Sequence, residues 1–115
     1  MPSRASILMK MHHYYEYRIK HEGLPGPDII KEQIAEIGHK RIISIVFLNH
    51  ANGNTYISIR TGQISRKYPK KIVLHGFPMG NSISIPNGDI IDIIESIFLH
   101  DDSWPYPKRF FYDSE

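Results

Sequence analysis

The sequence predicts an α+β domain: a curved antiparallel four-stranded sheet followed by a C-terminal helix, with an N-terminal strand–helix extension. Three observations lead to this prediction. The centre of the chain holds apolar or alternating runs of strand length, Asn52-Gly53 is a hairpin signal, and an apolar stripe at helical spacing runs from Ile90 to His100. With 115 residues we expect a single domain, made of an extension (1–36), a sheet-plus-helix core (37–100) and an aromatic tail (101–115).

The extension is predicted to contain one strand and one short helix. Residues 13–20 alternate between two sets of side chains, with Tyr15, Tyr17 and Ile19 on one side, which is typical of a half-buried strand. A loop rich in glycine and proline follows at 23–27. Asp28 can then cap a helix that ends at Gly38 and carries three isoleucines on one face: Ile30, Ile34 and Ile37.

Four strands are predicted in the core. The first, 41–48, is apolar on both faces apart from Ser44, as expected of a central strand. After the Asn52-Gly53 turn, the strand at 55–60 places Tyr56, Ser58 and Arg60 on one face. Residues 61–71 read as a polar, basic loop, and the remaining strands are predicted at 72–75 and 82–85.

The last predicted element of the core is a helix from Ile90 to His100. Asp89 near its start and His100 near its end suit the helix dipole. Its apolar stripe is broad for a helix that covers one small sheet, so burial against its own sheet and burial against a second subunit both stay open.

Charge is distributed very unevenly along the chain. The window from Gly38 to Gly88 contains seven basic residues and no acidic one, whereas all 12 acidic residues lie outside it. A sheet face with one sign of charge suits a polyanion, so we interpret the centre as a nucleic-acid-binding surface. The alternative is a solvated basic face without a ligand.

Other sequence features restrict the chemistry. The chain has no cysteine, which excludes disulfides and thiolate metal sites and fits an intracellular protein, in the nucleus of a eukaryote or otherwise in the cytoplasm. The seven histidines are scattered without the spacing of a zinc site, so we expect no metal and no cofactor. No apolar run approaches the ~20 residues of a membrane span, and no membrane partner is expected.

The centre of the chain also resembles a known family. Residues 37–45 (Ile-Gly-His-Lys-Arg-Ile-Ile-Ser-Ile) and 56–60 (Tyr-Ile-Ser-Ile-Arg) are similar to the opening hairpin of PC4/Sub1-like proteins, which are single-stranded-DNA-binding transcriptional coactivators. Lys70-Lys71 and residues 80–85 match the basic segment before that family's helix, and 90–98 matches the helix itself. The resemblance covers roughly residues 37–99. It departs from the family in a longer hairpin turn, a longer basic loop, and Gly62 or Gln63 where an aromatic residue is expected.

The resemblance implies a homodimer that presents a curved basic sheet to unpaired nucleic acid, with DNA favoured over RNA. Tyr56 and Phe47 would stack on bases, and the cations would follow the phosphates. The nucleic-acid-binding residues would then be Lys40, Arg41, Phe47, Tyr56, Arg60, Arg66, Lys67, Lys70 and Lys71. The dimer interface would be formed by the stripe of the last helix, namely Ile90, Ile93, Ile94, Ile97 and Phe98.

The sequence therefore favours a non-enzymatic single-stranded nucleic-acid-binding protein that acts in transcription or replication. Two other classes stay open. A small metal-independent ribonuclease could use His50 or His75 as general base, with Arg60 and Lys71 as cations. A small inhibitor or adaptor from a virus or mobile element could use the basic face to block nucleic-acid contacts.

Overall fold

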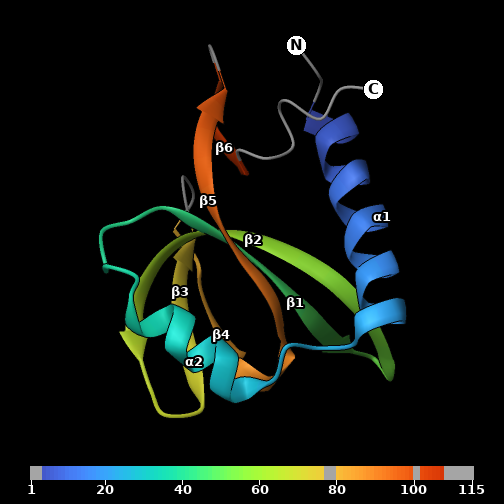
Figure 1. Cartoon of the computed structure of the whole chain (residues 1–115). Helices are drawn as coiled ribbons and strands as arrows, with labels where there is room; N and C mark the ends of the chain where they lie inside the picture. Colours follow the sequence, from blue (N-terminus) through green and yellow to red (C-terminus); the bar gives the residue numbers. More distant parts are fainter. Residues whose placement is uncertain (1–3, 77–79, 100–101, 108–115) are drawn as a thin grey trace.

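The computed structural model describes residues 4–76, 80–99 and 102–107. Within this part of the chain the elements are α1 (Arg4–Glu22), α2 (Pro27–Ala35), β1 (Ile43–Ala51), β2 (Asn54–Lys67), β3 (Lys71–Gly76), β4 (Ser82–Pro86), the 3-10 helix η1 (Asn87–Asp89), β5 (Ile90–Leu99) and β6 (Asp102–Pro107). The domain is α+β, as predicted, but both helices come before the sheet (Figure 1). Of the helices in these residues, none has the length and apolar character needed to cross a membrane.

The sheet is antiparallel throughout, with the strand order β4-β3-β2-β1-β5-β6. Strand β1 lies near its centre and pairs with β2 along one edge and with β5 along the other. The part of β5 up to Glu95 pairs with β1, whereas the part from Ser96 pairs with β6 and extends away from the other strands (Figure 1). Five strands, β1 to β5, therefore form the body of the sheet.

The body of the sheet curls around helix α2. Strands β4 and β5 lie at its opposite edges, yet only the three residues of η1 separate them in the chain. Four steps along the chain, from Pro86 to Ile90, span at most about 14 Å, whereas the edges of a flat five-stranded sheet lie about 19 Å apart. The sheet must therefore bend. We call the side that faces α2 the inner face and the opposite side the outer face.

The inner face holds the larger hydrophobic cluster. Ile30 and Ile34 of α2 are four residues apart, so they project from one face of the helix toward the strands. All five strands of the body contribute to this cluster, through Ile43, Ile45, Phe47, Ile64, Ile72, Leu74, Ile85 and Ile90. Full burial of such a side chain stabilises the fold by about 1.5–3 kcal/mol, so this cluster is a major source of stability.

Helix α1 covers part of the outer face. Met11 and Tyr15 pack on Val46 of β1 and on Ile91 and Ile94 of β5, and all five side chains are buried. The outer face of β3 and β4 is not covered in this way, and Lys71, His75, Ser82 and Ser84 are exposed there. The sheet is thus buried on both faces at its centre and open on one face toward β4.

One carboxylate lies between α1 and the sheet. The Tyr15 hydroxyl donates a hydrogen bond of 2.5 Å to Asp92 Oδ2, and Arg18 Nη1 lies 3.2 Å from the same oxygen. Asp92 is 9% exposed. A buried carboxylate must be compensated by donors or by opposite charge, and Tyr15 and Arg18 supply both from one helix.

The predicted strand at 13–20 is wrong, because these residues belong to α1. Met11, Tyr15 and Ile19 lie four residues apart and make one helical stripe against the sheet. Over so short a stretch, Tyr15 and Ile19 fit a period of two as well as a helical period. The strand pattern would place Tyr17 on the same side as Tyr15 and Ile19, but Tyr17 is 63% exposed.

The predicted C-terminal helix is also wrong, because Ile90–Leu99 form strand β5; His100 lies outside the described residues. The β1–β5 pairing contains a bulge: Phe47 pairs with Ile90 and Val46 with Asp92, which leaves Ile91 without an opposite residue. Ile90 and Ile93 therefore pack with the inner cluster, and Ile91 and Ile94 with α1. Because β5 contains a bulge and is buried on both faces, its apolar residues fall at positions that also fit an apolar helix.

The three remaining predictions differ in outcome. Residues 61–71 are not a loop, since β2 continues to Lys67 and β3 begins at Lys71, which leaves only a turn at 68–70. The hairpin turn is confirmed, and so is a helix in the predicted region after residue 27, but α2 has Gly26 and not Asp28 as its N-cap and ends at Ala35, before Gly38. Asn52 and Gly53 have φ of 53° and 79°, the left-handed pair that a two-residue hairpin turn requires.

Gly62 allows β2 to approach β3, and its substitution tests this packing. It pairs with Ile43 on one side and Gly76 on the other, and a Cβ at this position would lie 2.1 Å from the carbonyl oxygen of His75. We expect Gly62→Ala to lower the free energy of unfolding by about 1–3 kcal/mol in urea denaturation, because a backbone atom must move. Gly88→Ala is the control, since its Cβ would have no neighbour within 4 Å. Equal stability of the two variants would contradict the close approach.

Tyr15→Phe tests the contact between α1 and Asp92. This change removes the hydroxyl that donates to Asp92 and keeps the buried ring. Hydrogen bonds to charged groups contribute about 1.5–3 kcal/mol, so we expect a loss of that order in the free energy of unfolding. Tyr17→Phe, on the exposed side of the same helix, should change it by less than about 0.5 kcal/mol. A Tyr15→Phe protein as stable as Tyr17→Phe would show that Asp92 does not depend on this donor.

Candidate nucleic-acid interface

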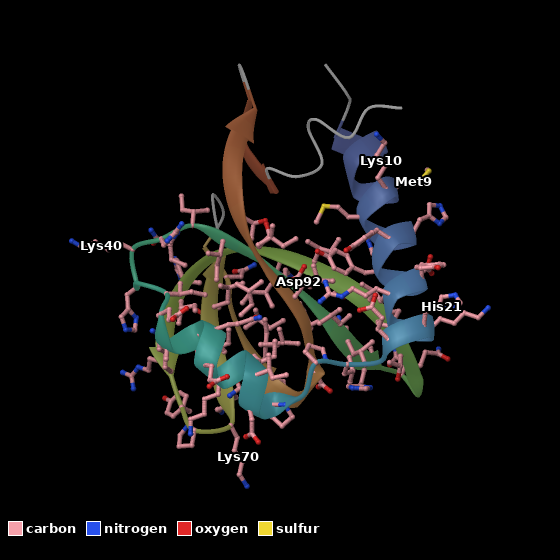
Figure 2. The ribbon with its side chains drawn as sticks, in the orientation of Figure 1. Met9, Lys10, His21, Lys40, Lys70 and Asp92 are labelled. Atoms are coloured by element: carbon pink, nitrogen blue, oxygen red, sulfur yellow. The ribbon has the colours of Figure 1, made fainter. Side chains whose placement is uncertain are left out.

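Six of the seven central cations lie in two neighbouring segments. Lys40 and Arg41 belong to the loop between α2 and β1, and the other four surround the turn between β2 and β3. All six are exposed, and we call them the basic flank: Lys40, Arg41, Arg66, Lys67, Lys70 and Lys71. In Figure 2, Lys40 and Lys70 lie away from α1, the helix on which Lys10 and His21 are labelled.

The two segments of the basic flank are held together by side-chain to backbone hydrogen bonds. Gln63 Nε2 donates to the carbonyl of Lys40 at 2.8 Å, and His39 Nδ1 donates to the carbonyl of Ile64 at 3.0 Å. Lys67 Nζ donates to the carbonyl of Ile37 at 2.6 Å. The α2–β1 loop is therefore fixed beside the second half of β2.

The β2–β3 turn is also fixed, and it presents an aromatic ring. The backbone N–H of Tyr68 donates to the carbonyl of Lys71 at 2.9 Å, and the N–H of Asn87 donates to the carbonyl of Lys70 at 2.9 Å. Lys71 Nζ lies 5.3 Å from the centre of the Tyr68 ring. Tyr68 is 41% exposed, so part of this ring stays accessible beside the cations.

The cations of the turn are not neutralised by ion pairs. Among residues 9–76 and 80–94, whose side chains the structure describes, the acid–base contacts include the Arg18–Asp92 ion pair and the contacts of His13 with Glu16 and of His50 with Asp89. None of them involves Arg66, Lys67, Lys70 or Lys71. The positive charge of the turn therefore faces solvent and is available to an anionic partner.

A pocket of about 480 Å³ lies beside the turn. It is lined by Pro27, Asp28 and Lys31 of α2, Pro69 and Lys70 of the turn, and Gly88 of η1. Lys31 and Tyr68 are absent from the site that the sequence predicts. Tyr68 lies between two basic pairs in the sequence, Arg66-Lys67 and Lys70-Lys71, which is a weak signal for a binding residue. For Lys31 no local pattern indicated that α2 would lie against this turn.

Three predicted binding residues lie elsewhere. Phe47 is 4% exposed and packs in the inner cluster, so its ring is not offered to a ligand. Tyr56 is 48% exposed, but it lies in the β1–β2 hairpin and borders a groove of about 570 Å³ against α1. Arg60 is exposed on β2, six residues before Arg66 and thus about 20 Å along the strand.

The groove beside α1 differs in character from the basic flank. Its floor is formed by Ile19, Leu48 and Ile57, and its rim carries both signs of charge, including Glu16 and Lys20. A mixed rim offers a polyanion no net attraction. We therefore take the basic flank and not this groove as the candidate interface.

The histidines of the ribonuclease hypothesis are not gathered with their proposed cations. His50 lies in the β1–β2 hairpin, where its Nδ1 is 2.9 Å from Thr55 Oγ1 and its Nε2 is 3.3 Å from Asp89 Oδ1. His75 shares the outer face of β3 with Lys71, four residues away, or about 13 Å along the strand. In the described residues no three His, Cys, Asp or Glu side chains are grouped as metal ligands.

The residues of the predicted dimer interface belong to strand β5. Ile90 and Ile94 are 0% and 6% exposed, because their own sheet and helices bury them. Ile93 is half-buried against the inner cluster. The side chains of Ile97 and Phe98 lie outside those that the structure describes. Ile90 and Ile94 are therefore not available to a second subunit on the surface of this protomer.

Comparison of the chain with family models, with curated proteins and with solved structures finds no match.

Proposed function

We propose that this protein binds single-stranded nucleic acid through the basic flank and has no enzymatic activity. One observation carries the proposal: the fold holds two separate cation-bearing segments next to each other and sets an exposed tyrosine beside Lys71. Such a surface can hold a phosphate backbone and stack on a base at the same time.

An unpaired strand suits this surface better than a duplex does. Its bases expose flat faces, and stacking on an aromatic side chain contributes about 1–3 kcal/mol per base. Tyr68 supplies the ring, while Lys70 and Lys71 on the same turn lie where the neighbouring phosphates would pass. The fixed geometry of the turn lowers the entropy lost on binding.

The proposal depends on the basic flank and not on the resemblance to PC4-like proteins. Strand β5 lies where that family has the helix that forms its dimer interface. The proposed binding therefore does not require a homodimer. Only the resemblance favours DNA over RNA. Binding assays should therefore use DNA and RNA oligonucleotides of the same sequence.

The double variant Lys70→Ala with Lys71→Ala tests the basic flank. We expect about tenfold weaker binding of a labelled oligonucleotide in fluorescence anisotropy, since two phosphate contacts are lost. The slope of log K against log salt should also become shallower by about 1.4, because each contact to a single strand contributes about 0.7. The matched control, Lys10→Ala with Lys20→Ala on α1, removes the same charge from the other side of the molecule. Equal losses in the two proteins would reduce the interaction to net charge and contradict a defined face.

Tyr68→Ala and Tyr56→Ala distinguish the two candidate stacking residues. The two rings are similarly exposed, at 41% and 48%, but only Tyr68 lies among the cations. We expect Tyr68→Ala to weaken binding by about 1–3 kcal/mol without altering its salt dependence, and Tyr56→Ala to leave binding unchanged. A loss only in Tyr56→Ala would move the interface to the β1–β2 hairpin. Degradation of RNA in the presence of a chelator would instead support the ribonuclease hypothesis.

A further inference from the structure

The pocket beside the basic flank is large enough to admit a flat ring such as a nucleobase. Its volume of about 480 Å³ lies within the range of small-ligand sites. Pro27 and Pro69 line it from two different elements and offer apolar ring surfaces. A nucleobase could enter here from a strand that lies along the β2–β3 turn.

The walls of this pocket are fixed to each other. Asn87 donates from its backbone N–H to the carbonyl of Lys70 at 2.9 Å, and from Nδ2 to the carbonyl of Pro69 at 3.4 Å. These bonds hold the β2–β3 turn against η1, whose Gly88 also lines the pocket. Helix α2 packs on the same 3-10 helix. The pocket is thus formed before any ligand arrives.

The charges in the pocket favour a ligand that has both an anionic part and hydrogen-bond donors. Lys31 and Lys70 attract a phosphate, whereas the Asp28 carboxylate repels one. A carboxylate accepts hydrogen bonds, so Asp28 requires a donor from the ligand. Asn87 does not line the pocket and is 2% exposed, so the Asp28 carboxylate is the acceptor that the pocket presents.

Among the bases, guanine matches this carboxylate best. It carries two adjacent donors, N1–H and the exocyclic amino group, which correspond to the two oxygens of one carboxylate. Adenine and cytosine place a ring acceptor beside their amino group, and thymine and uracil have one N–H between two carbonyls. Unpaired bases are read at this edge, which pairing would otherwise occupy.

We infer that this pocket binds an unpaired guanine of the strand held by the basic flank, with Asp28 accepting hydrogen bonds from its N1–H and amino groups. The inference rests on the proposed function and adds a base preference to it. Asp28 also lies in the first turn of α2, where a carboxylate stabilises the helix without any ligand. The experiment must therefore distinguish base reading from helix stabilisation.

The test measures anisotropy of labelled thymine octanucleotides in which one central base is guanine, inosine, adenine or cytosine. We expect the guanine strand to bind about tenfold more tightly than the all-thymine strand. Inosine, which lacks the amino group, should bind between the two. In Asp28→Asn the guanine preference should fall to less than about twofold, while the all-thymine strand binds at least as well, because a repelling charge is gone.

Two further variants test whether the effect belongs to the pocket: one removes a charge outside it, and the other blocks it. Glu32→Gln removes the same charge from an exposed position on α2 that does not line the pocket, so it should keep the guanine preference. Gly88→Leu adds a side chain where a Cβ meets no atom within 4 Å, so it should block the pocket without disturbing the fold. Circular dichroism of each variant checks that α2 is intact.

The outcomes separate the inference from the proposed function. Equal binding of all the octanucleotides, or a guanine preference that survives both Asp28→Asn and Gly88→Leu, would overturn the guanine pocket and leave the basic flank standing. Absence of binding to every strand would overturn the proposed function. Competition by free guanosine monophosphate, with no strand bound, would assign the pocket to a free nucleotide and overturn the strand-bound guanine.

Discussion

The attachment of α1 to the sheet depends on a buried carboxylate. Asp92 lies on the outer face of β5, where its neighbours Ile91 and Ile94 are covered by Met11 and Tyr15. Without donors from α1, this carboxylate would be desolvated at a cost of several kcal/mol. Tyr15 and Arg18 bind it and so select one orientation of the helix across the sheet. The central strands are then covered on both faces, as a strand as apolar as β1 requires.

The curl of the sheet determines where the candidate interface forms. Because η1 joins the two edges of the five-stranded body, it lies close to both α2 and the β2–β3 turn. Residues that are about 40 positions apart in the chain, such as Asp28 and Lys70, consequently line one pocket. The cations are clustered by the sequence, but their combination with an acceptor pocket is a product of the tertiary structure.

Local signals predicted those parts of the fold that local interactions determine. Asn52-Gly53 specifies its turn through left-handed φ values, and the isoleucine spacing of α2 survives in the structure. The predictions for the elements at either end of the chain were wrong because tertiary packing determines these elements. Helix α1 buries only one narrow stripe, and β5 is buried on both faces around a bulge. The site followed the same division. The cations of the turn could be found from composition, whereas the burial of Phe47 and the approach of Lys31 depend on how β1 and α2 pack.

The two partners of β1 have a consequence for biosynthesis. Strand β2 follows β1 after a two-residue turn, but β5 becomes available only after about 40 further residues have been made. A nascent chain that has left the ribosome as far as β4 therefore carries an apolar strand with one open edge. Such edges are templates for aggregation. We expect ribosome-stalled chains that end before Ile90 to recruit chaperones, and chains that extend past Glu95 to release them.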